Sequence, residues 1–81
     1  MPVKVAGIQN NIGLIYAEIK EYRTALAYYF KAEKINIAKH EKSLLAINYN
    51  NMATCYQKLN QFSSAQTYLQ KSLILRQEVS D

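Results

Sequence analysis

Paired asparagines are the residues of this chain best suited to specific contacts with another molecule. Asn10 and Asn11 recur as Asn50 and Asn51, forty positions later in a chain of 81 residues. An asparagine amide both donates and accepts hydrogen bonds, so it can bond the backbone of an extended peptide whatever the peptide's sequence. Two alternatives stay open. The amides can instead bond within the fold, and their recurrence can reflect nothing more than duplication of one unit.

The other reactive residues form no catalytic or metal-binding pattern. Cys55 aligns with Ile15 when the two halves are superposed, which indicates a small buried hydrophobe rather than a nucleophile. His40 has no second histidine and no cysteine near it, so neither a metal site nor catalysis is supported. The sequence also contains no glycine-rich phosphate loop, no carboxylate pair at catalytic spacing and no triad. We therefore expect no enzyme activity, no metal and no cofactor.

The forty-residue recurrence extends well beyond the asparagines. Further identical pairs are Tyr16 with Tyr56, Ala25 with Ala65, Tyr28 with Tyr68, and Lys31 with Lys71. Small, aromatic and aliphatic residues also match their own kind in the same register. A period of this size predicts stacked repeats, in which each unit buries its apolar face on a neighbour. Such a protein offers an extended surface rather than a pocket with chemistry.

The composition indicates an all-α fold. The chain has two glycines and one proline, and none of them follows Gly13. A β-rich domain of this length would need several turn-forming residues. Apolar residues instead recur every three or four positions, the spacing of one helix face, in four stripes: Val5 to Ile19, Tyr22 to Ile35, Leu45 to Leu59 and Phe62 to Leu73.

These stripes predict four helices of about seventeen residues in two antiparallel hairpins. The first helix is expected to start near Pro2, and the candidate N-caps are Thr24 or a nearby residue for the second helix and Ser63 for the fourth. Turns are expected near residues 20–22 and 60–62. Residues 36–43 leave two alternatives open, because they contain no glycine or proline. Tertiary packing can force a turn there, or residues 23–59 can form one helix that exchanges a hairpin with a second copy.

Charge and cysteine content limit the partners and the compartment. The net charge of +4 is spread along the chain, which weakly favours acidic partners and leaves a helical nucleic-acid binder as a minor alternative. One cysteine cannot form an internal disulfide, which fits a reducing compartment. No apolar run reaches the length of a membrane span, and no signal-peptide pattern is present. We expect a cytoplasmic protein without membrane contact.

The residues at the repeated positions resemble the tetratricopeptide repeat, whose pattern is W-x2-L-G-x2-Y, then A-x3-F, then P. The pattern falls on Gln9, Ile12, Gly13, Tyr16, Ala25 and Tyr29, and again on Tyr49, Met52, Ala53, Tyr56, Ala65 and Leu69. The usual proline is absent. The unit has 40 residues rather than the usual 34, and in this length it resembles the repeats of kinesin light chain and of bacterial peptide-pheromone receptors. The resemblance implies one all-α domain over residues 1–81, a solenoid fragment with repeats at about 3–40 and 43–80 stacked as an α-α superhelix.

Small residues have a defined place in that pattern. Gly13 is expected where the two helices of a hairpin approach most closely, with Ala25 as its small partner. Ala32 and Ser72 are expected to let the next repeat's helix approach.

The resemblance also implies a binding groove. In this family the first helix of each hairpin lines a concave surface, and the position of Asn11 and Asn51 often holds ligand backbone. Carried over, the groove residues are Asn10, Asn11, Leu14, Glu18, Asn50, Asn51, Thr54 and Lys58. Lys58 is the only cation of this face, so a clamp for peptide carboxyl termini is not expected. The resemblance thus implies a module that binds a protein or an extended peptide.

Two repeats are fewer than the roughly three that repeat arrays need for stability. The outer face of the last helix also has no helix to cover it: Leu69, Leu73, Ile74, Leu75 and Val79. We therefore expect a fragment of a larger scaffold or a self-associating unit. The main alternative is a homo-oligomerisation module without a peptide ligand. The sequence does not identify the ligand.

Overall fold

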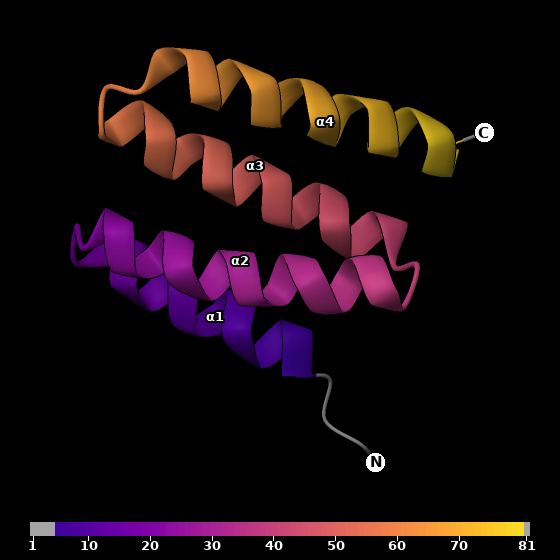
Figure 1. Ribbon diagram of the computed structural model, residues 1–81, viewed down its shortest axis with the longest axis horizontal. Helices are drawn as coiled ribbons and strands as arrows, with labels where there is room; N and C mark the ends of the chain where they lie inside the picture. The colour runs from indigo at the N-terminus through magenta and orange to yellow at the C-terminus, as the bar shows by residue number, and fades with distance from the viewer. Residues whose placement is uncertain (1–4, 81) are drawn as a thin grey trace.

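The computed structural model describes residues 5–80, and these form four α-helices joined by short turns (Figure 1). The helices are α1 (Val5–Glu18), α2 (Tyr22–Ala38), α3 (Lys42–Lys58) and α4 (Phe62–Ser80). Each helix runs antiparallel to the one before it, so the chain turns at alternate ends of the stack. The predicted all-α fold of two stacked hairpins is confirmed. The expected start near Pro2 lies outside the described residues, and the repeat boundaries stay a prediction.

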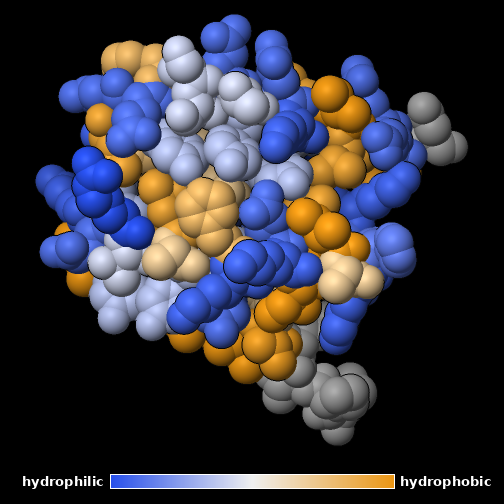
Figure 2. All heavy atoms as spheres, viewed as in Figure 1, coloured by the Kyte–Doolittle hydropathy of each residue, from blue (hydrophilic) through white to orange (hydrophobic). Residues whose placement is uncertain are grey.

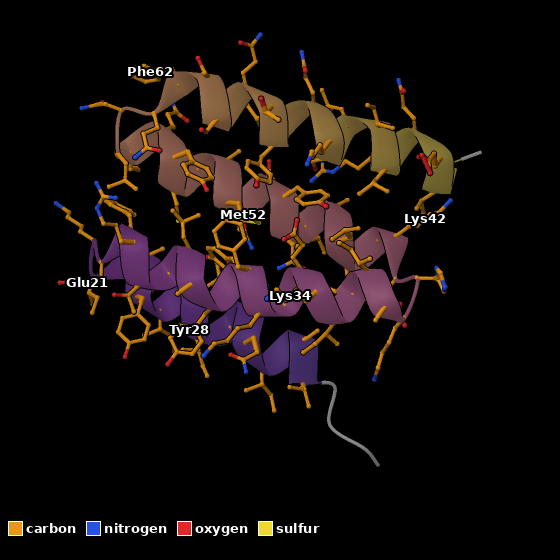
Figure 3. All side chains as sticks on the ribbon, in the orientation of Figure 1. Glu21, Tyr28, Lys34, Lys42, Met52 and Phe62 are labelled. Atoms are coloured by element: carbon orange, nitrogen blue, oxygen red, sulfur yellow. The ribbon has the colours of Figure 1, made fainter. Side chains whose placement is uncertain are left out.

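The helices pack in chain order, and the core lies where the two hairpins meet. α1 packs on α2, α2 on α3 and α3 on α4, with a small contact between α1 and α3. The buried cluster draws on α2 and α3: Ala25, Leu26, Tyr29, Tyr49, Met52 and Cys55. Met52 lies between these two helices (Figure 3) and is fully buried. The junction between the hairpins is therefore the centre of the fold.

All three turns have the same backbone structure, a Schellman motif. The left-handed residues are Lys20 (φ 66°), His40 (φ 55°) and Asn60 (φ 61°). In each turn the next residue donates its N–H to a carbonyl five positions back: Glu21 to Tyr16 (2.8 Å), Glu41 to Asn36 (2.9 Å) and Gln61 to Tyr56 (2.8 Å). Residues 39–41 thus separate α2 from α3, and the alternative of one helix over residues 23–59 is not adopted.

Neither Thr24 nor Ser63 is an N-cap, although a residue near Thr24 caps α2. Thr24 lies inside α2, whose N-cap is Glu21, and this residue makes no side-chain capping bond. Ser63 lies inside α4, which already begins at Phe62. The Schellman motif explains both results, because the residue that closes the turn also begins the next helix. The polar side chains that follow are therefore already within the first helical turn.

Gly13 is required by a close approach between α1 and α2. A Cβ atom at this position would lie 2.6 Å from Cε1 and 2.8 Å from Cδ1 of Tyr29, a buried ring. The expected close approach is confirmed, although the neighbour in contact is Tyr29. The equivalent pair in the second hairpin is Ala53 with Leu69. A larger residue on one helix thus accompanies a smaller residue on the other.

Ser72 has a different role from the one expected. Its hydroxyl donates to the carbonyl of Ala46 at 2.8 Å, and both residues are buried. Ala46 belongs to α3, which is the other helix of the same hairpin. The small side chain therefore allows α3 and α4 of one repeat to approach each other, rather than admitting the next repeat.

The Gly13–Tyr29 contact predicts a specific rescue. Gly13→Ala should destabilise the fold by about 1 kcal/mol, because overpacking of about 1–3 kcal/mol exceeds the gain of up to about 1 kcal/mol that alanine has over glycine in a helix. Adding Tyr29→Leu copies the second hairpin and removes the clash. Urea unfolding of both single variants and the double variant should give a double variant less destabilised than the sum of the singles. Additive losses would contradict the contact.

The turn at His40 should be stabilised by glycine. A non-glycine residue in the left-handed region costs about 1–2 kcal/mol, so His40→Gly is expected to raise the free energy of unfolding by about 1 kcal/mol. Thermal and urea denaturation measure the effect. Lys39→Gly is the matched control, because Lys39 has φ −97° and gains nothing from glycine. A loss of stability with His40→Gly would show that the histidine side chain, not its backbone conformation, maintains the turn.

Candidate functional site

The eight predicted groove residues lie on α1 and α3, the first helices of the two hairpins. The exposed members are Asn11, Leu14, Glu18, Thr54 and Lys58, and the half-buried ones are Asn10, Asn50 and Asn51. The structure brings Asn10 and Asn51 into direct contact across the two repeats. The Thr54 hydroxyl donates to the carbonyl of Asn50 within α3 at 3.2 Å.

Four asparagine side chains connect α2, α3 and α1. Oδ1 of Asn10 accepts from Nδ2 of Asn51 at 3.2 Å and from Nδ2 of Asn48 at 3.3 Å. Oδ1 of Asn48 in turn accepts from Nδ2 of Asn36. Asn36 and Asn48 are only 3 % and 1 % exposed. This amide network (Asn10, Asn36, Asn48 and Asn51) therefore runs from the buried junction to the half-buried side chains of Asn10 and Asn51.

The network answers part of the question that the sequence left open. Asn10 and Asn51 do bond within the fold, yet each keeps one group without a bond to residues 5–80: Nδ2 of Asn10 and Oδ1 of Asn51. Asn11 makes no hydrogen bond within the same part of the chain. The junction thus leaves one amide donor and one amide acceptor side by side.

Asn36 and Asn48 are the site residues that sequence reasoning missed. Asn48 falls in an apolar stripe with Met52 and Cys55, at the position that Ile8 takes in the first hairpin. A polar residue in such a stripe signals a buried hydrogen bond, because an unpaired amide is costly to bury. The partner Asn36 could not be identified in the same way, since it depends on how α2 crosses α3.

A pocket of about 180 Å³ opens beside the network. Its lining comes from three helices: Ala6, Gly7, Asn10 and Asn11 of α1, Asn36 of α2, and Leu44, Ile47 and Asn48 of α3. A Cβ atom at Gly7 would meet nothing within 4 Å, so the pocket is open at this point. Amides line one part and aliphatic side chains the other. The site can accept a small apolar side chain whose backbone reaches the amides.

A second repeated arrangement involves tyrosines and lysines. The rings of Tyr16 and Tyr28 stack with centroids 5.6 Å apart, and Lys31 Nζ lies 4.8 Å from the Tyr28 centroid. Their equivalents repeat this arrangement, with Tyr56 on Tyr68 at 5.4 Å and Lys71 Nζ at 5.1 Å from the Tyr68 ring. These stacked pairs join the two helices of one hairpin. The lysines already contact aromatic rings, which favours a packing role over phosphate contacts.

The buried titratable groups stay neutral near pH 7. Burial raises the pKa of the Cys55 thiol to about 11. Burial, and to a smaller extent Cys55, raises the pKa of Tyr29 to about 12, and burial with the nearby Glu33 does the same for Tyr49. None of these groups is prepared as a nucleophile. Residues 5–80 also contain no group of three or more His, Cys, Asp or Glu that could hold a metal ion.

A match to a known family covers nearly the whole chain. A family model described as a tetratricopeptide repeat matches residues 4–78, a span that includes all eight groove residues. Comparison with curated proteins and with solved structures gave no significant match. The resemblance found at the pattern positions is therefore confirmed, while the 40-residue length of the unit stays outside what the match tests. Within residues 5–80, no helix combines the length and apolar character needed to cross a membrane.

The buried end of the amide network should contribute more to stability than the exposed end. Asn48→Ala removes the acceptor of Asn36 and leaves that amide buried without a partner, which should cost about 1–3 kcal/mol. Asn11→Ala is the matched control, because this exposed amide makes no bond within the described chain and its loss should stay within about 0.5 kcal/mol. Urea denaturation compares the two variants. Equal small effects would show that the network adds nothing to the junction.

Proposed function

The chain belongs to the tetratricopeptide repeat family, whose repeats are generally non-catalytic protein-interaction modules, and we propose that it binds an extended segment of another protein between α1 and α3. One observation carries this proposal: the Asn10–Asn51 pair presents a free donor and a free acceptor where the two repeats meet. A peptide group has one N–H donor and one C=O acceptor, so it can form a hydrogen bond with each of these two free groups. The proposal includes the absence of catalysis and of any cofactor.

The amide network prepares the pair for a ligand. The two bonds that Asn10 accepts fix the orientation of its amide, and the bond that Asn51 donates fixes the second. An amide held in advance loses less conformational freedom when a ligand binds, which increases affinity. Asn11 and Asn50 lie next to this pair in sequence and add further donors and acceptors along the same two helices. The ligand backbone is therefore recognised without regard to its sequence.

Side chains around the pair set a modest selectivity. Leu14 and Ile47 are exposed, and Ile47 lines the pocket beside the network. Glu18 and Lys58, which end α1 and α3, carry opposite charges, so the groove selects no strongly charged segment. We propose that the ligand contains an aliphatic side chain that fills the pocket of about 180 Å³. The groove of two repeats is short, so binding by this chain alone is weak.

The cationic side chains favour a protein ligand over a nucleic acid. Lys31 and Lys71 lie over tyrosine rings, and Lys42 forms an ion pair with Glu78 at 3.0 Å near the end of α4 (Figure 3). These three cations already have partners, and the other cations are spread along the chain rather than gathered into one basic surface for phosphates. The proposal also retains a cytoplasmic location, which the single buried thiol of Cys55 supports.

Two substitutions test the groove without damage to the fold. Random peptides displayed on phage are selected on the chain, and the recovered peptide is titrated by fluorescence anisotropy. Asn11→Ala should weaken binding by about 3- to 10-fold, which is the loss of affinity expected when one hydrogen bond to the peptide is removed. Gly7→Leu should weaken it by at least about tenfold, because its side chain occupies the open pocket. Both variants should melt within a few degrees of the parent.

Ile37→Ala is the control, since Ile37 is exposed on α2, outside the groove. It should bind the recovered peptide as the parent does. Unchanged affinity with both groove variants would place the peptide elsewhere and overturn the proposal, as would the recovery of no peptide at all.

A further inference from the structure

The outward face of α1 carries an apolar stripe formed by Ile8, Ile12, Ile15 and Ile19. Ile8, Ile15 and Ile19 are 43 %, 59 % and 62 % exposed. The equivalent positions in the second hairpin are Asn48, Met52, Cys55 and Leu59. The first three of these are at most 1 % exposed, since α2 covers that face of α3. The same face is therefore buried in one repeat and open in the other. Figure 2 shows apolar side chains gathered along the edge where α1 lies.

We propose that this isoleucine stripe is the contact surface for a second copy of the chain. In the dimer, the two α1 helices pack against each other antiparallel across a two-fold axis. The inference is independent of peptide binding, because the groove residues Asn10 and Asn51 lie on a different face from the stripe.

α4 also exposes large apolar side chains, namely Leu69, Leu73 and Ile74, but two glutamines lie at the positions that would meet a further helix. On α2, Leu26 and Phe30 pack at the junction with α3. Their equivalents on α4 are Gln66 and Gln70, and both are exposed. A second copy that placed α4 on the isoleucine stripe would have to bury these amides without partners, which is costly.

The spacing of the stripe suits two copies of the same helix. The isoleucines follow one another at intervals of four, three and four residues, which is the a/d spacing of a coiled-coil seam. A seam of this kind is complementary to itself, as a two-fold interface requires. In the antiparallel arrangement, Ile8 faces Ile19 of the other copy, and Ile12 faces Ile15.

Charge selects the antiparallel direction. α1 has no acidic residue in its first turn and no basic residue in its last turn, while Glu18 lies at its C-terminal end. A carboxylate is unfavourable there, because the helix dipole places partial negative charge at that end. Antiparallel packing brings each Glu18 towards the positive end of the other helix. Parallel packing would bring the two carboxylates together.

The size of the interface predicts weak association. Ile8 and Ile19 are separated by about 17 Å along the helix axis, so the helix pair buries less than the roughly 800 Å² per partner of a standard interface. We expect a monomer near 10 μM and a dimer approaching 1 mM, which corresponds to a dissociation constant on the order of 100 μM.

Sedimentation equilibrium over this concentration range tests the proposal. Ile15→Glu should abolish the dimer and leave the helical circular dichroism unchanged, because Ile15 is 59 % exposed. Leu73→Glu is the matched control: Leu73 is 58 % exposed on α4, and its substitution should leave the dimer intact. Loss of association with both variants would indicate head-to-tail stacking and overturn the proposal. A parent chain that stays monomeric up to 1 mM would also overturn it.

Disulfide trapping tests the direction. A mixture of the single variants Ile8→Cys and Ile19→Cys should form mainly the mixed cross-linked dimer under mild oxidation, because these two positions face each other only in an antiparallel pair. Ile15→Cys alone should not cross-link in an antiparallel pair. The native thiol of Cys55 is buried and does not compete. Rapid cross-linking of Ile8→Cys, Ile19→Cys and Ile15→Cys each on its own would indicate parallel helices and contradict the assignment.

Discussion

The contact between α2 and α3 is the constraint on which the rest of the structure depends. Each hairpin alone is two helices with one shared apolar seam, which is too little to bury a core. The junction supplies the missing layer, because Tyr29 and Leu26 from one hairpin meet Met52 and Cys55 from the other. α2 and α3 are therefore covered on both sides, whereas α1 and α4 are covered on one. Every open surface of the molecule, including the groove, is a consequence of this order.

The buried amides give the junction a property that its apolar residues cannot. Two helices with stripes of similar hydrophobes can slide past each other by one turn at little cost, since most contacts are replaced by equivalent ones. Hydrogen bonds cannot be replaced in this way, because a shift leaves Asn36 and Asn48 buried without partners. The network thus favours a single register between the repeats, as a buried asparagine does in coiled coils. The same bonds orient the Asn10 and Asn51 amides at the surface.

The sequence predicted the features that repeat and missed those that depend on a particular crossing. Periodicity and the forty-residue recurrence identified the four helices and the two hairpins. The turn at His40 could not be predicted, because its left-handed residue is not glycine and only packing selects it. The caps at Thr24 and Ser63 were misassigned for a related reason, since the turn itself starts each helix. The partner of Asn48 depends on a contact between helices, which no local pattern encodes.

The two ends of the stack are unequal, and this inequality has a physical meaning. α4 carries glutamines where α2 carries Leu26 and Phe30, although it also exposes Leu69, Leu73 and Ile74. α1 retains isoleucines at the positions where α3 is buried, so its outer face resembles an internal repeat. Duplication alone would have made both ends equally apolar. Burying Gln66 and Gln70 of α4 without partners is therefore more costly than burying the isoleucine stripe of α1.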